Sequence, residues 1–235
     1  MRLTVLIFSA TNEVEEINME RQMAADRIIA QDYEVASRLD QLGLSASELI
    51  GVVHQAVAAK ANYVLNHPLN AAGQLSYIYG TGALRDMLRA KGWEIDRTGN
   101  IEATFDPKSG MKIVFQNADS ACEDGRDPKA ISDKGPAAIK AVDLGQQNLF
   151  PEYDAEDREK QKKENAALWY LFVYINGDDV RAELSFPKRI EEGQFKGFNE
   201  RIYVIKPGEW ASMMPKIDDN EPPAQDFEIN VTRKS

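Results

Sequence analysis

The first half of the chain places apolar residues with helical spacing. Between residues 14 and 42 they recur every three or four positions, with no Gly or Pro, which predicts a long amphipathic helix. Ser45 and Glu48 have the spacing of a capping box, and a second apolar stripe follows them as far as Pro68. Because the step between the two stripes is short, we expect antiparallel neighbouring helices. A third helix is predicted over residues 81–91.

At Trp93 the apolar period changes from 3.6 to 2. Strands are predicted over residues 93–95, 101–105 and 111–115, with turn-forming residues between them. This pattern is typical of a three-stranded antiparallel meander. Such a meander has one face to bury, and we expect the preceding helices to cover it.

A second group of strands is predicted near the end of the chain. Residues 168–175 form the most apolar run, and Asn176-Gly177 after it is a strong hairpin turn sequence. The remaining predicted strands cover residues 180–186, 201–205 and 227–232. An exposed acidic loop rich in Pro is expected before the last of them.

The segment between the two groups of strands is highly charged and has no apolar period. We therefore predict an α+β fold, with N-terminal antiparallel helices packed on a small antiparallel meander, followed by a second antiparallel β-sheet region. The expected units are residues 1–116 for the helices and meander, 117–167 for a charged surface linker, and 168–235 for the antiparallel β region with its acidic loop.

The charge of the chain indicates the kind of partner it binds. The chain contains 28 Lys and Arg residues against 38 Asp and Glu residues, a net charge of −10. This charge repels phosphate backbones and anionic lipid, so direct nucleic-acid binding is disfavoured and a protein partner with a basic surface is favoured. Residues 11–50 hold nine acids and three bases. The candidate partner-binding residues are Glu13, Glu15, Glu16, Glu20 and Asp26; the alternative is that they only solvate a helix face.

Cysteine content and apolar run length bear on the compartment. A single cysteine, Cys122, cannot form an internal disulfide, which fits a reducing compartment such as the cytoplasm. The apolar run at residues 3–8 is shorter than a signal-peptide core and is soon followed by acids. No apolar run reaches the roughly twenty residues of a membrane-spanning helix, so we expect no membrane insertion.

A Gly-x-Gly pattern offers an alternative, enzymatic function. Gly80 and Gly82 follow an apolar run and precede a predicted helix, so the Gly80-Thr81-Gly82 turn and Arg85 could hold the phosphate of a nucleotide or nucleic acid. A dinucleotide-binding loop, however, needs a small residue where Arg85 stands.

The other reactive residue types do not form a recognisable catalytic or metal-binding pattern. The two histidines, His54 and His67, are not paired, and the acids at positions 119, 123, 124 and 127 lack the spacing of a calcium loop. Acidic neighbours should raise the thiol pKa of Cys122. Arg181 and Glu183 share one strand face, which is commoner for cross-strand ion pairs than for acid–base catalysis. We therefore assign no catalytic residue, metal or cofactor.

The sequence as a whole favours an acidic cytoplasmic binding or regulatory protein rather than an enzyme. One concrete form is an inhibitor from a phage or mobile element that occupies the basic nucleic-acid site of a host nuclease complex. The length of the first predicted helix, which exceeds what a small domain can cover, also favours a homodimer.

Overall fold

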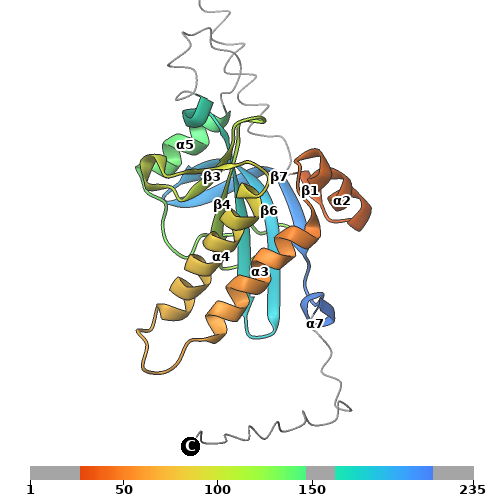
Figure 1. Cartoon of the computed structure of the whole chain (residues 1–235), viewed down its shortest axis with the longest axis vertical. Coiled ribbons are helices and arrows are strands. Elements are labelled where there is room, and N and C mark those ends of the chain that lie inside the picture. Colours follow the sequence, from red (N-terminus) through yellow and green to blue (C-terminus); the bar gives the residue numbers. More distant parts are fainter. Residues whose placement is uncertain (1–26, 147–161, 214–235) are drawn as a thin grey trace, which may run out of the picture.

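The computed structural model describes residues 27–146 and 162–213, and their strands form one seven-stranded sheet with helices on both faces (Figure 1). The sheet order is β1-β7-β6-β5-β4-β3-β2. In chain order the elements are β1 (Arg27–Ile29), α2 (Asp32–Gln41), α3 (Ala46–Ala61), α4 (Ala71–Arg89), β2 (Glu94–Asp96), the 3-10 turn η1 (Thr98–Asn100), β3 (Ala103–Asp106), β4 (Met111–Asn117), α5 (Pro136–Gln146), β5 (Ala167–Asn176), β6 (Asp179–Glu191), β7 (Gln194–Ile205) and α7 (Trp210–Met213).

The α+β class is confirmed, but the sheet is mixed rather than purely antiparallel. β1 pairs with β7, and β4 with β5, in parallel; the other pairs are antiparallel. The parallel β4–β5 ladder runs from Met111 opposite Ala167 to Asn117 opposite Val173. It joins the predicted meander and the predicted second β region in one sheet, in which β4 is an interior strand buried over residues 111–116. The unit boundaries at residues 116 and 167 stay predictions.

One face of the sheet is covered by α3 and α4, which lie side by side in Figure 1 and contact each other along their length. The core beneath them includes Val53, Leu84, Phe115 and Leu171, all at most 1% exposed. The capping box is confirmed. Glu48 N donates to the Ser45 hydroxyl, and the Glu48 carboxylate accepts from Ser45 N at 2.9 Å.

The long helix predicted over residues 14–42 is wrong where the structure describes it. Arg27–Ile29 is the parallel edge strand β1, and α2 has only 10 residues. Gly43, at φ 71°, ends α2, and Leu44 N donates back to Leu39 O at 2.9 Å. The chain bends by 94° between α2 and α3, so the predicted antiparallel pair is also wrong. The neighbour that α3 packs along is α4.

The other face of the sheet is covered in part by α5. An aromatic cluster lies on this face, in which the Phe172 and Phe195 ring centroids are 5.0 Å apart and those of Phe172 and Phe198 are 5.8 Å apart. The helix supplies Val142 to the same cluster. A helix therefore lies within the segment for which the sequence predicted a surface linker.

The predicted strands of the meander and the Asn176-Gly177 hairpin turn between β5 and β6 are confirmed. The predicted strand at residues 227–232 and the acidic loop before it lie outside the described residues. Among the helices that the structure describes, none alone has the length and apolarity to cross a membrane, although α2 and α3 together meet that test as a bent pair.

We expect Phe172→Ala to reduce the free energy of unfolding by about 3–5 kcal/mol, because Phe172 is 0% exposed and the substitution leaves a cavity between two aromatic rings. Urea denaturation followed by fluorescence measures this loss. Tyr79→Ala is the matched control: Tyr79 is 55% exposed, so its loss should stay near about 0.5 kcal/mol. Equal losses in the two variants would contradict the core placement of Phe172.

Candidate functional site

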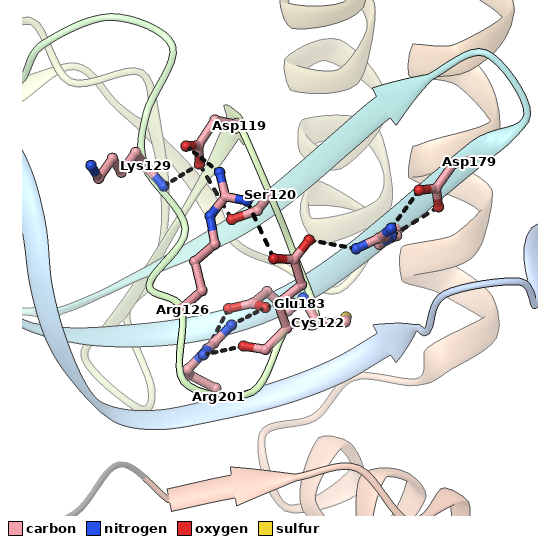
Figure 2. Close-up of polar contacts among 10 residues, drawn as sticks. Asp119, Ser120, Cys122, Arg126, Lys129, Asp179, Glu183 and Arg201 are labelled. Atoms are coloured by element: carbon pink, nitrogen blue, oxygen red, sulfur yellow. Dashed lines mark hydrogen bonds and ion pairs between the residues drawn. The ribbon is translucent and has the colours of Figure 1, made fainter.

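A buried ion pair joins β6 and β7 in the interior of the protein (Figure 2). The Arg201 guanidinium donates to the Glu183 carboxylate through Nε at 2.9 Å and Nη2 at 2.8 Å, and the two side chains are 1% and 0% exposed. Burial opposes the charge on Arg201, but the facing carboxylate outweighs it and raises the pKa of the guanidinium. The pair is bidentate, the strongest geometry available to these groups.

The loop that follows β4 folds over this pair and completes its hydrogen bonds. Cys122 N donates to Glu183 Oε2 at 2.5 Å, and Arg201 Nη1 donates to Glu123 O at 3.1 Å. The Ser185 hydroxyl donates to Glu183 Oε1 at 2.8 Å. Each carboxylate oxygen of Glu183 thus accepts two hydrogen bonds from the protein. A group satisfied in this way fixes the loop and leaves no acceptor for a substrate.

The acids of the same loop are also engaged by the protein. Arg181 donates to Glu123 at 2.6 Å, the Tyr203 hydroxyl donates to Asp124 at 2.9 Å, and Gly197 N donates to Asp127 at 2.8 Å. Arg126 donates to Asp119 at 3.0 Å. Within the described residues, no group of three or more His, Cys, Asp or Glu side chains is placed to hold a metal ion.

Cys122 belongs to this loop, and its buried thiol donates to Ala182 O of β6 at 3.1 Å. Burial is the main cause that raises the pKa of its thiol, and the Glu183 carboxylate adds to it. The direction agrees with the sequence prediction, but the cause differs: the sequence pointed to acidic neighbours along the chain. A buried thiol of this kind is a poor nucleophile.

The second candidate is a cleft of about 670 Å³ at a step in the sheet. The β3 ladder begins with Ala103 opposite Val114, so β4 runs three residues further, to Asn117. Residues of the first turns of α4 and α5 also line this cleft. The polar side chains that line the cleft are Asn70, Gln74, Tyr77, Asn100, Glu102, Gln116, Asn117, Ser132, Asp133, Lys134 and Tyr170.

Lys134 is the cation in this cleft. Its ammonium donates to Gln116 Oε1 and lies 6.0 Å from the ring centroids of both Tyr170 and Phe195. Burial against these rings lowers the pKa of Lys134 to about 8. No ion pair of Lys134 with a carboxylate is found in the described part of the chain. The cleft therefore contains a partly desolvated positive charge next to a neutral amide.

The structure corrects the predicted Gly80-Thr81-Gly82 turn. These residues lie in the middle of α4, not at a helix start, because the helix begins ten residues earlier than the sequence predicted. Gly80 serves packing: a Cβ there would collide with the Phe115 ring of β4. Arg85 pairs with Glu102. Phosphate binding at Gly80, Gly82 and Arg85 stays a prediction, but without the turn on which it was based.

The other sequence-based candidates have different outcomes. The acids Glu13, Glu15, Glu16, Glu20 and Asp26 lie outside the described residues. Glu183 was noted beside Arg181 on one strand face, but only the structure pairs it with Arg201. Lys134 was missed, and the signal in its sequence is weak: one lysine before Gly135-Pro136 at the start of α5.

Comparison of the chain with known protein-family models, with curated proteins and with solved structures found no match. The proposed function therefore depends on the residues of this chain and their geometry.

We expect Arg201→Met to reduce the free energy of unfolding by about 3–5 kcal/mol, because it leaves the Glu183 carboxylate buried and unpaired. The double variant Arg201→Met with Glu183→Gln should lose less than the single one, since no uncompensated charge remains. Arg189→Met is the control; its pair with Glu191 is 40% and 51% exposed, and its loss should be below about 1 kcal/mol. Urea denaturation measures the free energy of unfolding of all three variants. A double variant less stable than Arg201→Met would contradict this account.

Proposed function

We propose that this chain is an acidic binding or regulatory protein that engages a macromolecular partner with a basic surface. The observation that carries the proposal is the distribution of charge between the described fold and the rest of the chain. The described residues hold 23 Asp and Glu against 21 Lys and Arg, a net charge of −2. Residues 1–26, 147–161 and 214–235 together hold 15 acids and 7 bases, and so carry −8 of the total of −10.

The contacts within the fold support this division. The acids of the loop after β4 are bound by Arg126, Arg181, Tyr203 and backbone amides, and Glu200 is bound by Arg38 at 2.5 Å. Negative groups neutralised in this way contribute little to attraction at long range. The net charge of −8 in residues 1–26, 147–161 and 214–235 would steer a basic partner and accelerate its association.

The partner that fits this chemistry is a protein whose basic groove normally holds a phosphate backbone. An inhibitor from a phage or mobile element, acting on a host nuclease complex, is the concrete form that we retain. Residues Glu13, Glu15, Glu16, Glu20 and Asp26 are the proposed contact residues. Occupation of such a groove would exclude nucleic acid by competition for the same surface.

The test reverses three of these charges. We expect Glu13→Lys, Glu16→Lys and Glu20→Lys together to slow association at least about tenfold, because electrostatic steering sets the rate. The partner is first isolated on the immobilised wild-type protein, and association is then measured by surface plasmon resonance at two salt concentrations. Single-stranded DNA is added as the competitor.

The matched control reverses three exposed acids of the fold, Asp40, Asp86 and Asp143, to Lys. It changes the net charge by the same amount at a different place. If the control slows association as much as the first triple variant, net charge alone is responsible and the proposed contact residues are wrong. Unchanged association in both variants would overturn the whole proposal.

The expected homodimer loses its original argument, because β1 interrupts the long helix on which it was based. The oligomeric state stays a prediction. Light scattering at tens of micromolar should give twice the chain mass of 26.3 kDa if the dimer forms, and a monomer mass would remove it from the proposal.

A further inference from the structure

We propose that the cleft at the step between β3 and β4 binds the carboxylate of a small polar molecule through the ammonium of Lys134. This site is distinct from the acidic segments, because it attracts an anion and lies within the described fold. Its volume of about 670 Å³ is within the range of about 300–1,000 Å³ typical of small-molecule sites.

The positive charge of Lys134 is not compensated by a carboxylate among the described residues. Lys134 is held against two aromatic rings, and its ammonium donates one hydrogen bond, to the neutral Gln116 amide. An ammonium has three N–H donors, so two stay available to a ligand. A charge moved out of water in this way is costly unless a counter-charge is supplied. A bound anion would supply it.

The other titratable groups of the cleft do not compete with an incoming anion for the Lys134 ammonium. Asp133 accepts from Gln194 at 2.7 Å, and Glu102 accepts from Arg85 and Arg97. Burial is the main cause that raises the pKa of the phenols of Tyr77 and Tyr170, so both are neutral near pH 7. Lys134 is then the group that an incoming anion meets with its charge unneutralised.

The lining of the cleft favours one kind of anion. The Asp133 carboxylate in the wall of the cleft accepts from the neutral Gln194 amide and keeps its charge, so it opposes a second negative charge on the ligand, and a monoanion fits better than a doubly charged phosphate. The amide side chains of Asn70, Gln74 and Asn100 present both donors and acceptors. They suit a ligand whose body carries amide or hydroxyl groups, such as an N-acyl amino acid.

The experiment titrates N-acetylglycine into the wild-type protein at pH 7 and follows binding by calorimetry. We expect Lys134→Met to weaken binding at least about tenfold. Lys60→Met is the matched control, because Lys60 is also a partly buried lysine with a lowered pKa, but it donates to Ile175 O at 2.5 Å and lies away from the cleft. The control should bind as the wild type does. Equal binding by wild type and Lys134→Met would overturn the proposal.

A second measurement needs no variant. Lys134 binds the anion in its charged form, so affinity should be constant well below its pKa of about 8 and fall as the pH rises through that value. At about pH 9.5 we expect a loss of at least about tenfold, and binding near pH 8 should be accompanied by proton uptake. A third measurement titrates inorganic phosphate in place of N-acetylglycine. Affinity that persists at high pH, or phosphate bound more tightly than N-acetylglycine, would overturn the proposal.

Discussion

The parallel pairing of β4 with β5 is the constraint on which the rest of the structure depends. Two parallel neighbours cannot be joined by a tight turn, because the chain must return from one end of the sheet to the other. The return begins with the loop over Glu183 and Arg201 and continues through Lys134 into α5. Both candidate sites thus include residues of the same connection, and α5 within it covers part of the aromatic face of the sheet.

The two sites differ in how their buried charges are compensated. Around Glu183 every oxygen and nitrogen of the ion pair finds a protein partner, so the cost of burying two charges is offset inside the fold. The Lys134 ammonium instead donates to the neutral Gln116 amide and lies near two aromatic rings. The first arrangement fixes a loop against the sheet, whereas the second retains an attraction that an external group can satisfy.

Local patterns could be predicted from the sequence, whereas long-range pairings could not. The capping box at Ser45, the strands of the meander and the Asn176-Gly177 turn depend on residues close together in the chain, and they are confirmed. β1 has three residues, too few for a period, and its partner β7 lies far away in sequence. Gly80 was misread because removing a side chain serves a tight turn and a close helix–strand contact equally well. The cleft around Lys134 draws on five separate elements, α4, η1, β4, α5 and β5, so no spacing along the chain could reveal it.

The position of Cys122 has a practical consequence. It is the only thiol in the chain, and it is 6% exposed within the loop that closes over Glu183, with its sulfur against β6. A thiol reagent can reach it only when that loop separates from β6, so the rate of modification reports how often this opening occurs. Compared with denaturation of the whole protein, this rate would separate the local stability of the loop from the stability of the sheet. The chain therefore contains its own reporter of partial unfolding, at the place where the crossover leaves β4.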